Sequence, residues 1–158
     1  MGFFHTLAVI LVRHLPAWVV SLAIYILKPK VVVGVVSVVP KGDGTYLFLH
    51  HTYRKQYAWR LPGGLAERHE EPFQTAVREL YEEANIIAKA VCVLDVRRST
   101  YSTLDVAVLC TVESSLPFTK NIEVDDLLWV DPHQAPFAIT KDQMAFLHAA
   151  TLWLSRDK

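Results

Sequence analysis

The chain has 158 residues, and its 16 Lys and Arg residues balance its 16 Asp and Glu residues, so its formal net charge is zero. This length suits one domain with a hydrophobic core and is short for two. No basic run exceeds a pair such as Arg97-Arg98, so we expect no binding to duplex nucleic acid. Cys92 and Cys110 lack C-x-x-C spacing, which excludes the usual zinc and redox motifs and predicts free thiols.

Residues 1–30 differ from the rest of the sequence because they are strongly hydrophobic. Arg13, His14 and Pro16 interrupt the apolar segment, and the run that follows is shorter than the roughly 20 residues of a membrane-spanning helix. Two interpretations are open: a helix that packs on the domain or on a sister subunit in a homodimer, or an anchor at a membrane. We predict a cytoplasmic protein, with membrane association as the alternative.

The composition changes at residue 31, where the globular domain is expected to begin. The β-branched run 31–39 predicts a buried strand, and residues 45–51 predict a second one. The turn sequence between them favours a hairpin over residues 31–51. A loop rich in Tyr, Arg and Lys then leads to a Pro-Gly-Gly sequence.

The clearest expected element is a helix that begins at Pro72, a residue that suits the first helical position. Apolar residues recur at steps of three and four along it and would form one buried stripe: Phe73, Ala76, Val77, Leu80 and Ala84. Asn85 is placed to end the helix, because Asn tolerates the left-handed conformation of a helix cap.

Three more strands and a helix are expected towards the C-terminus. Residues 89–97 and 104–112 predict a second hairpin, and residues 127–130 predict a short strand. A final helix would open at Thr140, whose spacing to Gln143 is that of a capping box. Strands mixed with one central and one terminal helix predict an α/β layered domain with a mixed sheet.

Glu79, Glu82 and Glu83 lie three and four residues apart on the expected central helix, so they share one face. Like charges at this spacing cost only about 0.2 to 0.5 kcal/mol per pair, so a solvated face with Arg78 paired to Glu82 is one interpretation. The other is a site for Mg²⁺ or Mn²⁺, which take carboxylate oxygens and bridge to phosphates. Two adjacent glycines ahead of the helix favour it, because they let the backbone approach a ligand.

This region resembles the signature of the Nudix hydrolases, G-x5-E-x7-R-E-U-x-E-E-x-G-U, in which U is an aliphatic residue. The match is in register at Gly64, Glu70, Arg78, Glu79, Leu80, Glu82, Glu83 and Ile86. The departure is Asn85 in place of the last Gly, at a structural position. The resemblance implies a Nudix-type α/β/α sandwich with a mixed β-sheet over residues 31–158, and it leaves a hydrophobic N-terminal helix in residues 1–30 unexplained.

The resemblance also implies a divalent-metal-dependent enzyme in which water attacks a pyrophosphate. On this basis Glu79, Glu82 and Glu83 are the metal ligands, Glu67 is a further candidate, and the metal is Mg²⁺ or Mn²⁺. Arg78 would hold these carboxylates in place, and Glu79 or Glu83 would also orient the attacking water.

Other functional residues must lie outside the signature. For the general base, the candidates are Glu123, Asp125 and Asp126, although a solvated acidic loop explains at least two of them. For the substrate, Tyr57 and Trp59 are candidates to stack on a base and Arg60 to bind a phosphate. Aromatic residues at strand ends pack in the core at least as often as they bind ligands.

The leading hypothesis is hydrolysis of the pyrophosphate bond in a nucleoside diphosphate linked to another group, of the ADP-ribose, nucleotide sugar or nucleoside triphosphate type. One alternative is a non-hydrolytic sensing or interaction module with the Nudix fold. Another is a membrane-associated hydrolase of lipid-linked pyrophosphates, which the apolar first 30 residues motivate.

Overall fold

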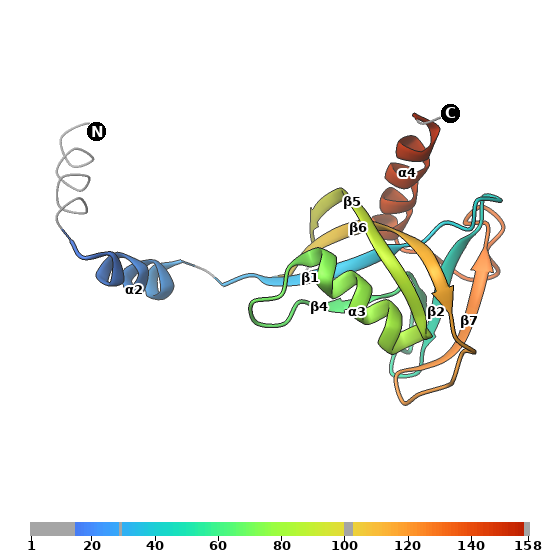
Figure 1. The fold of residues 1–158 in the computed structure, drawn as a ribbon, viewed down its shortest axis with the longest axis horizontal. Helices are drawn as coiled ribbons and strands as arrows, with labels where there is room; N and C mark the ends of the chain where they lie inside the picture. Colours follow the sequence, from blue (N-terminus) through green and yellow to red (C-terminus); the bar gives the residue numbers. More distant parts are fainter. Residues whose placement is uncertain (1–14, 29, 100–102, 157–158) are drawn as a thin grey trace. The chain divides into compact units, whose positions relative to one another are not determined.

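The computed structural model describes residues 15–28, 30–99 and 103–156. The chain divides into two compact units, Met1–Lys30 and Val31–Lys158 (Figure 1). Arg13 and His14, which interrupt the apolar segment in the sequence, lie outside the described residues.

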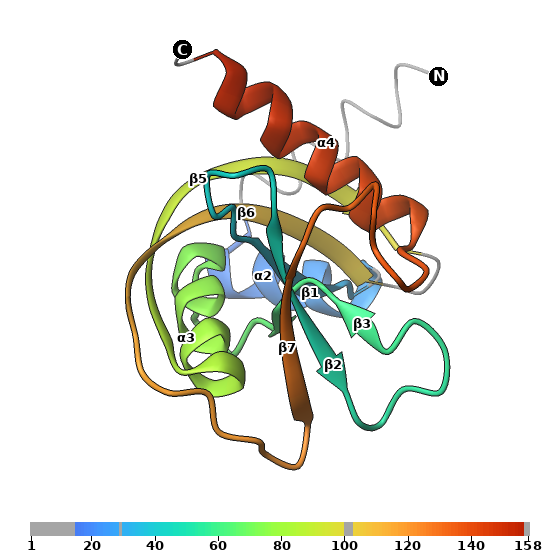
Figure 2. The same cartoon turned by 90° about the vertical axis from the view of Figure 1, so that its right-hand side faces the viewer.

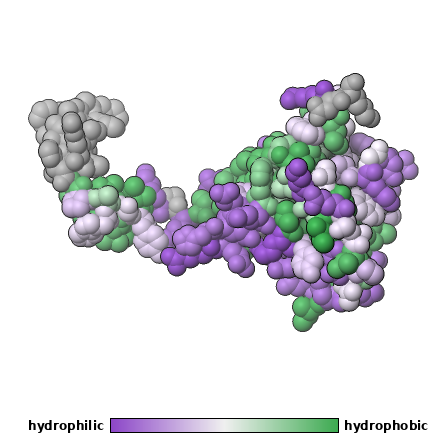
Figure 3. All heavy atoms as spheres, in the orientation of Figure 1, coloured by the Kyte–Doolittle hydropathy of each residue, from purple (hydrophilic) through white to green (hydrophobic). Residues whose placement is uncertain are grey.

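Helix α2 (Ala17–Leu27) is the described helix of the first unit, where an N-terminal hydrophobic helix was predicted. It contains no charged residue, and none of its residues is buried. Hydrophobic residues cover much of its surface in Figure 3, and the exposed fraction of Leu27 is 77%. Within the described residues, no helix combines the length and the apolar character needed to cross a membrane.

The second unit contains two β-sheets. The four-stranded sheet has the order β4 (Gly63–Leu65), β1 (Val32–Val38), β6 (Thr103–Ser115), β5 (Ile86–Arg98). The three-stranded sheet has the order β3 (Trp59–Arg60), β2 (Tyr46–His51), β7 (Val124–Val130). β1 runs parallel to β6 while its other neighbour, β4, is antiparallel, so the larger sheet is mixed, as predicted.

The predicted hairpin over residues 31–51 is wrong, whereas the second hairpin is confirmed. Both edges of β1 are occupied by β4 and β6, so β2 pairs instead with β3 and β7 in the other sheet. Among the described residues, the two predicted partners meet near the turn, where Pro40 bridges to Tyr46 and the Leu47 N–H donates to the Val39 carbonyl at 3.1 Å. β5 and β6 do pair antiparallel, over longer strands than the sequence indicated.

Helices α3 (Pro72–Ala84) and α4 (Lys141–Ser155) pack on two separate cores (Figure 2). Alternate residues of β1 divide between these cores: Val33 and Val35 join the cluster of α3, and Val36 and Val38 join the cluster of α4. Burial on both faces explains the continuous β-branched run of this strand. The layers are those of the predicted α/β/α sandwich.

Helix α3 has the predicted bounds, and Asn85 ends it in the left-handed region with φ of 55°. Ala76, Leu80 and Ala84 are buried as predicted, but Phe73 is 40% exposed. The buried face also includes a residue that the apolar pattern did not include, Glu83, which is 5% exposed. This inward position makes Glu83 the first candidate for function.

Candidate metal and phosphate site

Arg78 lies at the centre of the acidic cluster on α3. Its guanidinium donates to both oxygens of the Glu70 carboxylate, at 2.9 and 3.1 Å. Its Nη1 also donates to Glu79 at 2.8 Å and to Glu82 at 2.9 Å. The bonds from Arg78 lower the pKa of Glu70 to about 2, because they stabilise the charged carboxylate. One cation therefore gathers three glutamates, and the predicted Arg78–Glu82 pair is confirmed.

Glu70 also orders the loop between β4 and α3. Its Oε2 accepts from the Glu67 backbone N–H at 2.9 Å and from the Thr75 hydroxyl at 2.9 Å. Arg78 donates to the Leu65 carbonyl at 3.2 Å, on the other side of this loop. The loop is thus fixed by the same charged pair that positions the helix carboxylates.

Glu83 points from α3 towards β4. Its Oε2 accepts from the Gly63 N–H at 2.9 Å. Burial raises the pKa of Glu83 to about 8, against the opposing effect of the Gly63 bond, and Glu79 and Glu123 add to the increase. Burial also raises the pKa of Glu79, although Arg78 acts in the other direction. For both carboxyl groups burial has the largest effect on the pKa, and for Glu79 it outweighs the neighbouring Arg78.

The adjacent glycines of β4 provide the room for this arrangement. Gly63 has φ of 146°, and a Cβ there would overlap the Val35 carbonyl oxygen. A Cβ on Gly64 would overlap the carboxylate of Glu79. Because glycine alone has no Cβ, this strand can lie against both β1 and the acidic face of α3.

A cavity of about 730 Å³ lies beside Gly63 and Gly64. Of the predicted substrate-binding residues, Tyr57 and Arg60 line it. Trp59 does not: its ring stacks on Phe137, with ring centroids 5.1 Å apart and 13° between the planes. Trp59 therefore packs in the core, which was the alternative interpretation for aromatic residues at strand ends.

A more open groove of about 850 Å³ lies between α3 and β5, where Phe73 and Lys89 contribute to its lining. Glu67 and Arg78 also line this groove, but Glu79 and Glu83 do not. Neither residue lines the cavity beside the glycines, but its lining residues Gly63 and Gly64 lie directly against Glu83 and Glu79, so this cavity is the better candidate for chemistry.

A family model described as the NUDIX domain matches residues 28–150. The chain belongs to the Nudix family. The signature that the sequence resembles lies within the matched residues, and Asn85, in place of its last glycine, adopts the left-handed conformation.

Curated relatives share the Nudix region of this chain. It is 34% identical to "Putative 8-oxo-dGTP diphosphatase 3" of Mycobacterium tuberculosis (strain ATCC 25618 / H37Rv), over 61% of this chain and 50% of that protein. It is 29% identical to "Nucleoside diphosphate-linked moiety X motif 6" of Xenopus laevis, over 60% of this chain and 47% of that protein. The chain spans about half the length of these relatives.

Solved structures show the same fold. The crystal structure of a UDP-X diphosphatase superposes with a TM-score of 0.69 at 21% identity, covering 87% of this chain and 72% of that one. An ADP-ribose pyrophosphatase from Streptococcus suis 89-1591 gives a TM-score of 0.66 at 19% identity, covering 77% and 92%. At these identities the likeness concerns the fold alone.

The Nudix residues fit a divalent metal by their chemistry. All the candidate ligands are carboxylates, which suit a hard cation. Burial raises the pKa of Glu79 and Glu83 more than their polar contacts lower it, and a bound cation would add positive charge that favours the ionised carboxylates. Over the described residues, no three His, Cys, Asp or Glu side chains already converge as a metal cage. Arg78 engages Glu79 and Glu82 instead.

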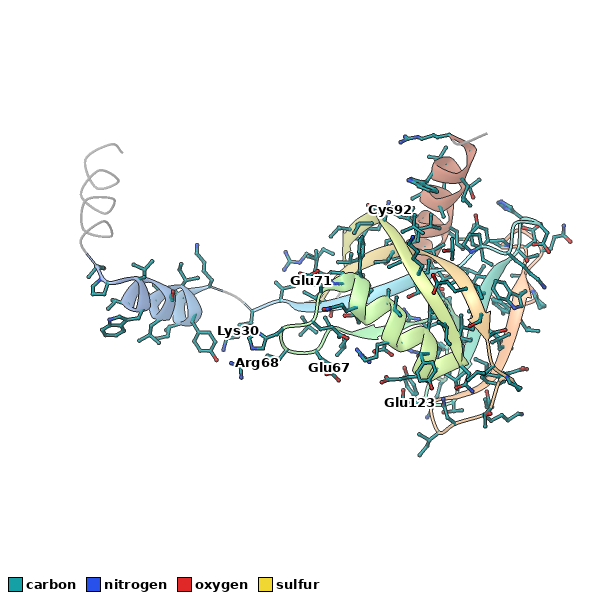
Figure 4. The ribbon with its side chains drawn as sticks, in the orientation of Figure 1. Lys30, Glu67, Arg68, Glu71, Cys92 and Glu123 are labelled. Carbon is teal, nitrogen blue, oxygen red and sulfur yellow. The ribbon has the colours of Figure 1, made fainter. Side chains whose placement is uncertain are left out.

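The other predicted ligand and base candidates occupy different positions. Glu67 is exposed in the loop before α3, and Glu123 in the loop before β7 (Figure 4). Glu123 acts on the pKa of both Glu79 and Glu83. Asp125 is paired with His50, and the exposed Asp126 accepts from the Leu127 N–H. Of the three base candidates, only Glu123 is coupled to the buried carboxyls.

Two polar residues of this cavity were not predicted as site residues. His51 is 3% exposed, its Nδ1 has no hydrogen-bond partner, and it lies 3.8 Å from Glu83 Oε1. Burial, followed by the charges of Arg60 and Arg54, lowers the pKa of His51 to about 4, so the ring is neutral near pH 7. The other is Gln143, which is 2% exposed. For both residues, the sequence signal that could have indicated a site was a polar residue among apolar neighbours.

Proposed function

We propose that this chain is a metal-dependent hydrolase of the pyrophosphate bond in a nucleoside diphosphate linked to another group. The observation that supports this most is the buried Glu83 beside the Gly63 N–H, with Arg78 gathering the neighbouring carboxylates. A binding module has no need for buried carboxyl groups with raised pKa, whereas such groups are common in catalytic sites.

In this proposal Glu79, Glu82 and Glu83 hold Mg²⁺ or Mn²⁺, and Glu67 is an outer candidate. The metal, when bound, neutralises phosphate oxygens and polarises the phosphorus for attack. Arg78 then orients Glu79 and Glu82, because its bonds to Glu70 fix the guanidinium.

The attacking water needs a carboxylate that accepts its proton. Glu79 and Glu83 are candidates to orient the water, and Glu123 is the candidate base outside the signature. On the substrate side, Arg60 and Tyr57 line the cavity and offer a phosphate contact and an aromatic surface. Arg60 is half-buried, and its charge would lie where the phosphates are neutralised.

The test is a substrate panel with the full chain: ADP-ribose, UDP-glucose, nucleoside triphosphates and farnesyl pyrophosphate, each with Mg²⁺ and with Mn²⁺. We expect release of nucleoside monophosphate or pyrophosphate from a nucleotide, and loss of this activity in EDTA. Liquid chromatography of the products identifies the bond that is cleaved. Failure to hydrolyse every compound would favour the sensing module, and hydrolysis of farnesyl pyrophosphate alone would favour the lipid substrate.

We propose separately that residues 1–30 contact an anionic membrane. Helix α2 is apolar on all sides, whereas a helix that packs on one protein surface has a polar face as well. Near its end, Lys30 Nζ lies 3.9 Å from the centre of the Tyr25 ring, a combination typical of membrane interfaces. No Asp or Glu precedes Asp43 in the sequence.

A flotation assay with the full chain tests this contact. We expect co-flotation with vesicles of phosphatidylcholine and phosphatidylserine, because each lysine near an anionic surface strengthens binding by about fivefold. The variant Ile24→Asp should remain in the soluble fraction, and Ile122→Asp, a change at an exposed residue of the other unit, should float normally. A chain that stays off vesicles and sediments as a dimer would support the homodimer instead.

A further inference from the structure

The cavity beside the acidic cluster has a second end that the proposed chemistry does not use. At the first end lie Gly63 and Gly64, next to the carboxylates. At the second end the lining comes from β6 and from the start of α4 and is largely polar: Thr103, Asp105, Thr140, Asp142 and Gln143. Strand β1 joins the ends, because Gly34 pairs with Leu65 on one side and with Asp105 on the other.

Gln143 is the unusual member of this second end. It is 2% exposed, and neither its side-chain nitrogen nor its side-chain oxygen has a hydrogen-bond partner among the described residues. Its backbone N–H is held by the Thr140 hydroxyl at 3.3 Å, at the start of α4. The predicted capping box is therefore only half present, because the Gln143 side chain makes no bond back to Thr140.

An unpaired amide in this position needs a reason. Nearly all buried polar groups in proteins are hydrogen-bonded, and leaving one unpaired destabilises the fold. Its neighbours on the buried face of α4 are Phe146, Leu147 and Ala150, so a leucine would suit the site. A binding partner that is absent from the free protein explains why an amide stands there.

The amide itself indicates what the partner offers. A glutamine side chain presents one donor group and one acceptor side by side. Nucleobases present a neighbouring donor and acceptor on their edges, which Gln and Asn bind with two hydrogen bonds. An isoprenoid or lipid tail offers neither, and it would bury the carboxyl of Asp105 and the hydroxyl of Thr103 against hydrocarbon.

We infer that Gln143 binds the base of a nucleotide substrate, through paired hydrogen bonds from its side-chain amide on the side of the cavity lined by β6 and α4. This inference rests on the proposed function and assigns a residue to the recognition of the nucleobase that its substrate carries. Phe146, which also lines the cavity and is 1% exposed, supplies apolar surface next to the amide. The pyrophosphate would then extend along β1 towards Arg60 and the acidic cluster.

The test compares Gln143→Leu with the wild-type chain on two substrates that differ only in the base. One is the nucleoside triphosphate that the wild type hydrolyses best, and the other is the matching sugar triphosphate without a base. We expect Gln143→Leu to lower kcat/KM for the nucleotide by about 5- to 150-fold, the worth of one paired contact to a base. For the compound without a base, kcat/KM should change by less than about twofold, because the lost contact is absent there too.

Thermal unfolding without ligand provides a second measurement. Because the amide has no partner among the described residues, Gln143→Leu should raise Tm by about 2 to 6 °C. The matched control is Gln134→Leu, which changes an exposed glutamine in the turn before α4 and should alter neither Tm nor substrate preference. A residue that only supports the fold would lower Tm and reduce activity on both substrates equally, and this result would overturn the inference.

The proposed function and this inference fail in different ways. If the wild type hydrolyses nothing, the proposed function is wrong, and Tm measured with millimolar nucleoside monophosphates still tests Gln143. A rise in Tm for the wild type that Gln143→Leu loses would then support base binding. An equal rise in both proteins would overturn it, as would a wild type that hydrolyses the compound without a base as efficiently as the nucleotide.

Discussion

Replacing Glu83 with Gln should lower kcat by a factor of about 10² to 10³ at saturating Mg²⁺. Glutamine has nearly the same shape and can still accept from the Gly63 N–H, so the fold should persist. What it lacks is the negative charge that a divalent ion requires. Steady-state kinetics at several Mg²⁺ concentrations measure the effect, and Glu113→Gln, at an exposed position of β6, is the matched control.

The same variant gives a pH-dependent result that separates lost chemistry from misfolding. In the metal-free protein, burial raises the pKa of Glu83 from 4.5 to about 8. Between these values the folded chain keeps a proton that the unfolded chain has released, so stability falls as the pH rises. Glu83→Gln removes this contribution. Its Tm in EDTA should therefore fall less than that of the wild type between about pH 5 and pH 8.

Near-native turnover of Glu83→Gln with Mg²⁺ would show that Glu83 is not a metal ligand. A Tm far below that of the wild type at about pH 5, where both side chains are neutral, would instead indicate a structural role. Activity lost together with a smaller pH dependence of Tm is the combination that the buried carboxyl predicts.

Local patterns in the sequence were sufficient for the elements whose partners are close in the chain. The apolar stripe and Asn85 predicted the bounds of α3, because a helix is stabilised within its own segment. The β5–β6 pairing was also predictable, since a short connection favours antiparallel neighbours. The pairing of β1 was not, because its partner β6 begins 71 residues after the start of β1, at Thr103 against Val32.

The residues of the candidate site also divide into those that the sequence could place and those that it could not. Glu79, Glu82 and Arg78 are near neighbours on one helix, so their spacing predicted their contacts. His51 could not be placed beside Glu83 from the sequence, because only the packing of β2 against α3 brings them within 3.8 Å. Gln143 was assigned to a helix cap by its spacing, and only its burial without a partner indicates binding.

Replacing Gly63 with Ala should destabilise the protein by about 3 to 5 kcal/mol. The φ of 146° lies in a region that residues with a Cβ rarely adopt, and the new methyl group would overlap the Val35 carbonyl oxygen. That oxygen belongs to the backbone of β1, so no side-chain rotation relieves the overlap. For a chain of this size, thermal unfolding should show a loss of about 6 to 20 °C in Tm.

Gly42→Ala is the control that separates backbone strain from overlap. Gly42 also has a positive φ, of 89°, but nothing lies within 4 Å of an added Cβ, so its cost should be about 1 kcal/mol. Activity gives the remaining distinction, because the Gly63 N–H donates to Glu83 and any shift of β4 moves that carboxyl. Gly63→Ala should therefore lose kcat even at temperatures where it remains folded, whereas Gly42→Ala should keep it. Equal losses of Tm in the two variants would mean that the close approach of β4 to β1 contributes nothing beyond the backbone angle.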